Sequence, residues 1–324
     1  MRRLPVFQVD AFAERPFEGN PAAVVPLQSW PGDALMQAIA AENNLSETAF
    51  FAPEGEGFRL RWFTPEVEVD LCGHATLASA HVLFAHLGFA GEAARFLTHS
   101  GELIVRREGA DGLYAMDFPA RRGPEIAPPE GLAAALGARP RLCLKTGPML
   151  AVLDSPEELL ALSPDFPALR RLCQRLGGIG LTVTAPCRGP EGWDFVSRHF
   201  SPARGIDEDP VTGAAHTVLV PYWSARLGKT RLVARQASRR GGTLWCTDAG
   251  ARVILRGRCA DFLKGEIGSK DTVTPRYFFG RLENRDGKGA VEPPRRETPI
   301  CTASSTSRGG SSGSPPSTTS CSSR

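Results

Sequence analysis

Long apolar runs are missing from this chain of 324 residues, and no window approaches the roughly 20 apolar residues of a membrane-spanning helix. The start, MRRLPVFQVDAF, has two arginines but no apolar stretch behind them, so we expect no signal peptide. The formal net charge of +3 is too small to indicate nucleic acid or a membrane surface as a partner. These absences favour a globular protein of the cytoplasm.

Paired cysteine spacings are also missing. The eight cysteines are scattered, at positions 72, 143, 173, 187, 246, 259, 301 and 321, and none belongs to a CxxC or similar pair. Such pairs are typical of structural zinc sites and redox motifs, whereas disulfide frameworks are typical of small secreted proteins. We therefore expect reduced thiols and no bound metal.

Both helix and strand patterns are present. Helical spacing predicts helices over 33–44, 75–87 and 214–227, with Asp33 as a candidate N-cap after a Pro-Gly step. The runs SETAFF, FRLRWFTP, LTVTAP and WDFVSRHF have the composition of strands. This mixture indicates an α+β protein.

Two of the predicted helices resemble each other. Gly73 to Gly88 reads GHATLASAHVLFAHLG, and Gly213 to Gly228 reads GAAHTVLVPYWSARLG. A similar strand end precedes each segment, Phe-Thr-Pro in one case and Phe-Ser-Pro in the other. The helices are apolar nearly all round, as a buried central helix should be. This weak repeat predicts two similar lobes, each with a small-residue helix wrapped by strands.

The glycine turns at Gly73 and Gly213 open these helices. A helix start presents unpaired N–H groups and the positive end of the helix dipole, so it can hold a carboxylate or phosphate. The alternative is that glycine merely allows close packing between helix and sheet. The duplication leaves both interpretations open.

Cys72 and His74 flank the first of these glycines and have three interpretations. Catalytic zinc requires three protein ligands, and no second pair at ligand spacing exists, with His216 as the only remote candidate. A nucleophilic Cys72 needs a base and a lowered pKa, which the helix start could provide. The third interpretation is a helix start that forms a wall of a substrate site.

Two carboxylates are candidates for proton chemistry. Glu47 directly precedes the apolar run Ala-Phe-Phe, where burial would raise its pKa and suit it to act as general base or acid. Asp209 stands just before the second glycine turn. The plain alternatives are a solvated loop carboxylate for Glu47 and a turn or cap residue for Asp209.

Several linked motifs resemble one known family. GNPAAVV, NLSETAFF, RWFTPEVEVDLCGHATLASA, DEDPVTGAAH, YWSARLGK and SRRGGTL follow in order between about residue 4 and residue 267. They are similar to the PhzF family of phenazine biosynthesis-like proteins, and most of all to its vertebrate members. The resemblance implies a diaminopimelate-epimerase-like α+β fold with lobes at 1–118 and 119–267, each a mostly antiparallel sheet around a central helix. The last strand is expected to return to the first lobe.

The resemblance also implies an activity. The family's bacterial type member is a cofactor-free isomerase that moves a proton on a dihydro-hydroxyanthranilate. By this likeness Glu47 removes and returns the proton, while His74 and Asp209 bind the substrate. We expect the amides of Gly73 and Gly213 to hold its carboxylate, and Asn20 of the GNP turn to line the same site. The expected partner is a small, cyclic carboxylate, with no coenzyme and no metal.

The sequence departs from the family pattern in ways that keep rivals open. Ala214 replaces a serine that contacts substrate, and Pro210 stands where related two-base epimerases carry a second cysteine, so no two-base racemase is expected. One rival is an interaction module without turnover, because the vertebrate relative is named as a partner of a WD-repeat protein. Another is a cysteine-dependent hydrolase or transferase that uses Cys72.

The chain beyond the resemblance differs in character. Residues 298–324 are rich in Ser, Thr, Gly and Pro, and segment 268–324 as a whole is predicted to be a non-family, largely disordered tail. It resembles an alternative or frame-shifted end. A homodimer would be an ordinary assembly for such a protein.

Overall fold

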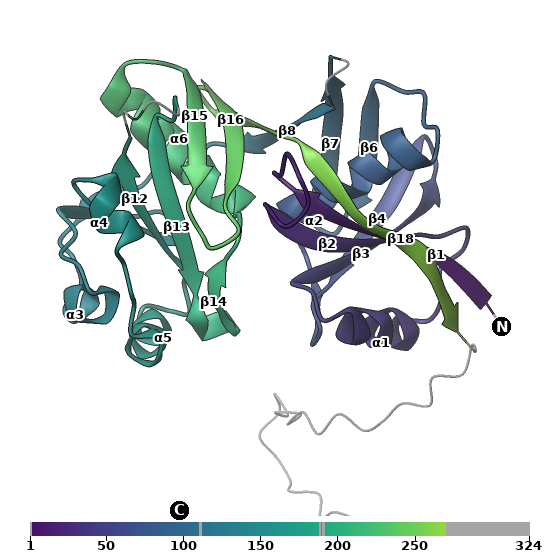
Figure 1. Ribbon diagram of the computed structural model, residues 1–324, viewed down its shortest axis with the longest axis horizontal. Coiled ribbons are helices and arrows are strands. Elements are labelled where there is room, and N and C mark those ends of the chain that lie inside the picture. The colour runs from purple at the N-terminus through teal and green to yellow at the C-terminus, as the bar shows by residue number, and fades with distance from the viewer. Residues whose placement is uncertain (1, 110–111, 188, 190–191, 270–324) are drawn as a thin grey trace, which may run out of the picture. The chain divides into compact units, whose positions relative to one another are not determined.

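The computed structural model describes residues 2–109, 112–187, 189 and 192–269, and these residues form two lobes (Figure 1). In the first lobe, strands surround the central helix α2, and α1 packs on β3 and β4. Its elements are β1 (Arg2–Ala11), β2 (Asn20–Pro26), α1 (Asp33–Asn43), β3 (Glu47–Glu54), β4 (Gly57–Phe63), β5 (Glu68–Val69), α2 (Gly73–His81), the π-helical turn η1 (Val82–His86), β6 (Ala93–Thr98), β7 (Gly101–Glu108) and β8 (Leu113–Pro119).

The second lobe surrounds α6, and the short helices α3, α4 and α5 gather on one side of it (Figure 1). Its elements are β9 (Glu125–Ile126), α3 (Leu132–Leu136), β10 (Leu142–Lys145), β11 (Met149–Val152), α4 (Pro156–Leu160), α5 (Phe166–Arg175), β12 (Leu181–Pro186), β13 (Phe195–Ser201), η2 (Pro202–Arg204), β14 (Ile206–Asp209), α6 (Gly213–Leu227), β15 (Arg231–Gln236), β16 (Gly242–Ala249) and β17 (Arg252–Gly257), and β18 (Cys259–Ser269) follows.

Strand pairing confirms the internal repeat. The first lobe has the order β1–β2–β3–β4–β6–β7–β8, and the second has β10–β11–β12–β13–β15–β16–β17. In each lobe the second and fourth steps are parallel and the other steps are antiparallel. The predicted α+β architecture of two similar, mostly antiparallel lobes is therefore correct.

Three further pairings complete the sheets, and two of them, β8 with β17 and β1 with β18, join segments far apart in the sequence. β8 pairs with β17, and β9 pairs with β10. β18 runs antiparallel to β1 over its whole length, so the last described strand completes the sheet of the first lobe. A disturbance of β18 would therefore reach the first lobe directly.

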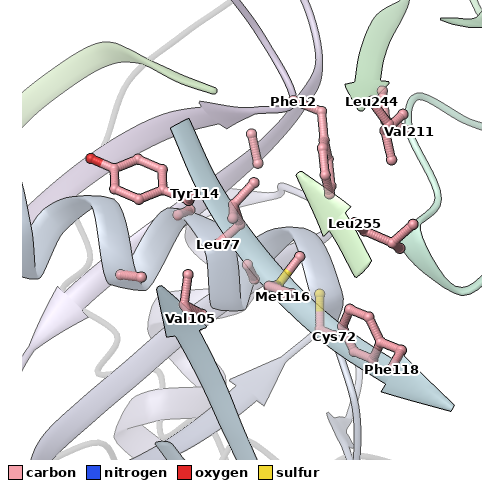
Figure 2. Packing of buried hydrophobic residues seen from close by; sticks show 14 of the residues in the cluster. Phe12, Cys72, Leu77, Val105, Tyr114, Met116, Phe118, Val211, Leu244 and Leu255 are labelled. Carbon is pink, nitrogen blue, oxygen red and sulfur yellow. The ribbon is translucent and has the colours of Figure 1, made fainter. Parts of the chain in front are cut away.

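The core lies around the two central helices because both are built from small and apolar residues. Every residue from His74 to Ala80 in α2 is buried, as is most of α6. One hydrophobic cluster contains Leu77 of α2, Phe118 of β8 and Leu255 of β17, together with Phe12 and Val211 from the loops that approach the helix starts (Figure 2). The starts of both helices are thus held by a continuous packed core.

Some expectations need correction. The helix predicted over 75–87 ends as an α-helix at His81 and continues as the π-helical turn Val82–His86. Asp33 is the first residue of α1 rather than its N-cap, which is Gly32, and its carboxylate pairs with Arg61 at 2.9 Å. Residues 268 and 269, which were assigned to the predicted tail, end strand β18, and the rest of that tail lies outside the described residues. Among the helices of the described chain, none is long and apolar enough to cross a membrane.

Candidate active site

Glu47 is the first residue of β3, where the chain enters the core beside β2. Only 15% of its side chain is exposed, and its Oε2 atom lies 3.3 Å from Nε2 of His74. Neither of these two atoms has a hydrogen-bond partner among the described residues. A buried carboxylate oxygen and a buried imidazole nitrogen without partners are typical of a site that receives a polar ligand.

Burial also sets the protonation states of this pair. It raises the pKa of Glu47 from an ordinary value of 4.5 to about 7, with a contribution from the charge of Asp209. Burial lowers the pKa of His74 to about 4, so its imidazole is neutral at pH 7. Near neutral pH, Glu47 is therefore present both as carboxylate and as acid, and His74 is a neutral hydrogen-bonding group.

Cys72 precedes α2 and is packed among apolar side chains that include Phe118 and Met116 (Figure 2). Its Sγ atom lies 3.5 Å from Nδ1 of His74. Burial raises the pKa of the thiol well above its ordinary value, and the neighbouring carboxylates of Glu47 and Asp209 raise it further. The lowered pKa that a nucleophilic Cys72 would need is therefore absent here, which disfavours that interpretation.

The same three side chains are the candidate metal ligands of the site. Ligand atoms of Glu47, Cys72 and His74 all lie within 4.8 Å of one another. Sequence spacing could not supply the third ligand, since Glu47 is far away along the chain. His216, the remote ligand candidate of the sequence, is not in this group, and its Nδ1 lies 2.9 Å from the Thr212 carbonyl oxygen. A metal here would have to displace the proton from a thiol whose pKa is raised.

Asn20 and Asp209 join the two lobes at the site. The Asn20 amide is fully buried, and its Nδ2 donates to Oδ1 of Asp209 at 2.8 Å and to the Val211 carbonyl at 2.9 Å. Burial raises the pKa of Asp209 to about 6, although hydrogen bonds from Thr212 and Asn20 oppose that shift. The end of β14, which carries Asp209, is therefore fixed by the first residue of β2.

Gln236 and Thr212 belong to this arrangement and were missed by sequence reasoning. The Gln236 side chain accepts a hydrogen bond from the Thr212 amide at 2.8 Å and donates to the Asp209 carbonyl at 2.8 Å. The Thr212 hydroxyl donates to Oδ2 of Asp209. Thr212 lies within the DPVTG stretch and was visible, whereas Gln236 only ends an unremarkable strand.

Gly73 and Gly213 each begin a central helix, and neither start has a side-chain cap within the described chain. A Cβ added at Gly73 would meet Phe118 at 3.8 Å, and one at Gly213 would meet Leu255 at 4.0 Å, both ordinary contacts. Packing therefore does not require glycine at either position, which weakens the close-packing interpretation. Ala214, where the family pattern has serine, is exposed at the start of α6.

Asn20→Ala is expected to destabilise the protein by roughly 2–4 kcal/mol, because it leaves two acceptors, on Asp209 and Val211, without their donor. Urea unfolding would measure the change. The matched control is Asn43→Ala, which removes a single bond to the Thr48 hydroxyl at 3.1 Å and should cost roughly 1 kcal/mol. Equal costs for the two variants would contradict the role of Asn20 as a clamp between lobes.

Comparison with known proteins gives a consistent result. The sequence model of the family described as phenazine biosynthesis-like protein, PhzC-PhzF, matches residues 9–265. A Pseudomonas aeruginosa protein named an uncharacterized isomerase is 54% identical over 264 residues, which cover 82% of this chain and 98% of the relative. Phenazine biosynthesis-like domain-containing protein 2 of Mus musculus is 40% identical over 290 residues, covering 82% and 99%.

A solved structure agrees with these relatives. The PhzF family protein of Enterococcus faecalis is 46% identical, with a TM-score of 0.79, and the match covers 83% of this chain and all of that one. The diaminopimelate-epimerase-like fold is therefore confirmed. The bacterial relative is more similar in sequence than the mouse protein, contrary to the nearness to vertebrate members expected from the motifs.

Proposed function

Because the chain belongs to the PhzF family of phenazine biosynthesis-like proteins, we propose that it is an isomerase whose proton carrier is Glu47 and which needs no coenzyme. Bacterial relatives at 54% and 52% identity are named uncharacterized isomerases, which supports the reaction class. The substrate we propose is a small, cyclic carboxylic acid with an acidic C–H bond.

The observation that carries this proposal is the raised pKa of the buried Glu47 carboxyl group. A carboxyl group with a pKa of about 7 is present in both protonation states at neutral pH, which suits a residue that must take up a proton and give it back. Its Oε2 has no hydrogen-bond partner in the described chain and is available to a C–H bond of a ligand. In the forward step the carboxylate takes a proton from one carbon, and as carboxylic acid it returns that proton to another carbon on the same face.

The neighbouring groups account for substrate binding. The neutral His74 imidazole stands 3.3 Å from Glu47 and can hydrogen-bond the substrate without supplying a charge. Asp209, held by Asn20 and Thr212, lies close enough for its charge to raise the pKa of Glu47 and can hold a polar substituent of the ring. The uncapped helix starts at Gly73 and Gly213 are suited to the substrate carboxylate and to developing negative charge.

The test is deuterium uptake from D₂O, followed by NMR, with trans-2,3-dihydro-3-hydroxyanthranilate and a panel of small cyclic acids. Wild-type protein should place deuterium on a substrate carbon. Cys72→Ser should exchange at a rate close to wild type, since the raised thiol pKa excludes Cys72 as the base near neutral pH. A Cys72→Ser variant that is folded yet inactive would contradict the proposal that Glu47 alone carries the proton, and it would support cysteine chemistry.

An absence of exchange with every compound would favour the rival that the family name also allows, an interaction module that kept the fold. Ala214 and the non-family tail favour that rival, and Ala214 does so because a substrate-contacting hydroxyl of the family pattern is missing there. Ala214→Ser restores that hydroxyl at an exposed position and would separate the cases. Exchange that appears or rises in this variant would show a working site with altered substrate preference.

A further inference from the structure

A second group of ligating side chains lies at the far end of α2, away from Glu47. His81 ends α2, His86 ends the π-helical turn η1, and Asp261 belongs to β18. The Nε2 atom of His81 lies 3.0 Å from Oδ1 of Asp261, and Nε2 of His86 lies 2.9 Å from the same oxygen. We call these three residues the His81–His86–Asp261 cluster.

The π-helical turn brings the two histidines together. In an α-helix, residues five apart point about 140° away from each other, because each residue turns the chain by about 100°. The i→i+5 bonds of η1, such as Leu87 N to the Val82 carbonyl at 3.1 Å, widen the turn. The ring centroids of His81 and His86 are consequently only 5.6 Å apart. π-turns of this kind are rare and often occur at functional sites.

A β-bulge in β18 orients the carboxylate of Asp261. In the pairing of β18 with β1, Gln8 faces Leu263 and Val9 faces Asp261, so one residue of β18, Phe262, is extra. Such a β-bulge changes the direction in which nearby side chains point. Two departures from regular geometry, one in the helix and one in the strand, thus direct three ligating groups to one point.

Neighbouring side chains hold both histidine rings of the cluster in place. Nδ1 of His81 lies 3.0 Å from the Tyr114 hydroxyl, the kind of partner that orients a ligating ring from its other nitrogen. The His86 ring stacks on Phe7 with centroids 5.0 Å apart, which fixes its plane. The histidines are largely buried, with side chains 12% and 20% exposed, whereas Asp261 is 51% exposed and leaves an open side toward solvent.

We propose that the His81–His86–Asp261 cluster binds a divalent transition metal ion of the zinc class. Two imidazoles and one carboxylate are the ligand set that Zn²⁺ accepts with water in a fourth position. Ligands bound at about 2.1 Å in tetrahedral geometry stand roughly 3.4 Å apart, so the present separations need to widen by only a few tenths of an ångström. Mg²⁺ and Ca²⁺ prefer oxygen ligands and should not compete.

The bound ion would connect the end of α2 to β18, the strand that completes the first lobe beside β1. It lies outside the Glu47 site, and its role is structural, because it binds the folded arrangement of helix and strand and not the separated elements. Saturation with metal should therefore raise the unfolding temperature.

The experiment uses the full chain, freed of metal, and titrates Zn²⁺ by calorimetry with thermal unfolding as a second readout. His86→Gln is expected to weaken Zn²⁺ binding by roughly tenfold or more and to remove the thermal shift. Asp261→Asn, at a half-exposed position that should not affect folding, is expected to do the same. Mg²⁺ at the same concentration should give no shift.

Two control variants make the result specific. His99→Gln removes a half-exposed histidine that also stands near two carboxylates, with Nδ1 4.0 Å from Glu68 and 3.8 Å from Asp70, and it should bind Zn²⁺ as wild type does. Glu47→Gln tests the other ligand group of the described chain and should also leave binding unchanged. The proposal is overturned if wild type shows no Zn²⁺-dependent shift, or if binding survives in His86→Gln and Asp261→Asn but is lost in Glu47→Gln.

Discussion

Replacing Glu47 with glutamine should abolish proton exchange, lowering its rate by at least about 10²–10⁴-fold. Glutamine keeps the size and the hydrogen-bonding outline of the side chain but can neither accept nor release the proton. Binding of a carboxylate ligand should persist, because His74, Asp209 and both helix starts are untouched. Deuterium uptake measured beside a binding titration would separate the two effects.

The matched control is Glu54→Gln, at the other end of the same strand β3. Glu54 pairs with Arg59 at 2.6 Å, and this partner lowers the pKa of its carboxyl group, so it has no role in proton transfer near neutral pH. Its variant should exchange at the wild-type rate. Equal activity of Glu47→Gln and wild type on an accepted substrate would remove Glu47 as the carrier.

The pH dependence of exchange follows from the same group. Uptake that begins with proton abstraction should rise with pH as Glu47 ionises, with a midpoint near its pKa of about 7. An ordinary glutamate would give a midpoint near 4.5. A profile flat between pH 5 and pH 9 would mean that another group limits the reaction.

Much of the fold could be predicted because its signals are local. The central helices read as runs of small and apolar residues, and their glycine starts and glycine ends made the repeat visible. Sequence reasoning did not specify strands β15 to β17, and the return of the last strand, β18, to the first lobe was expected only from the family resemblance. Their register depends on partners far along the chain, as in the pairing of β18 with β1, and a single sequence does not contain that information.

In the candidate site, too, residues in local motifs could be predicted, whereas contacts between distant parts of the chain could not. Glu47, His74 and Asp209 stand in motifs, whereas the support of Asp209 by Gln236 depends on a strand that folds back from 27 residues away. The His81–His86–Asp261 cluster escaped notice because a spacing of five residues separates side chains on a regular helix, and only the π-turn unites them. The raised pKa of Cys72 could not be read from the sequence, because the burial and the two carboxylates that raise it are tertiary features.

Glu47→Gln should also stabilise the protein at alkaline pH, by about 3 kcal/mol at pH 8 and above. The folded protein holds the Glu47 proton with a pKa of about 7, whereas the unfolded chain releases it near 4.5. Between those values the folded state binds more protons than the unfolded state, so wild-type stability falls as the pH rises through this window. The stability that the Glu47 proton gives the folded wild type is fully present below pH 4 and has been lost above pH 8.

The variant lacks this titration, so the difference in unfolding free energy between Glu47→Gln and wild type should grow from near zero at pH 4 to its full size by pH 8. Urea unfolding at several pH values would measure it, with Glu54→Gln as the control that shows no such growth, because the pKa of Glu54 is lowered by Arg59. Asp209 titrates in both proteins and cancels from the difference unless the loss of the Glu47 charge shifts it.

If the variant is not stabilised at pH 8, Glu47 is more solvated than its burial implies. Its pKa then lies below 7, and it is less suited to carry a proton at neutral pH. A gain in stability together with a loss of exchange would show that the same desolvation serves the chemistry at the expense of the fold.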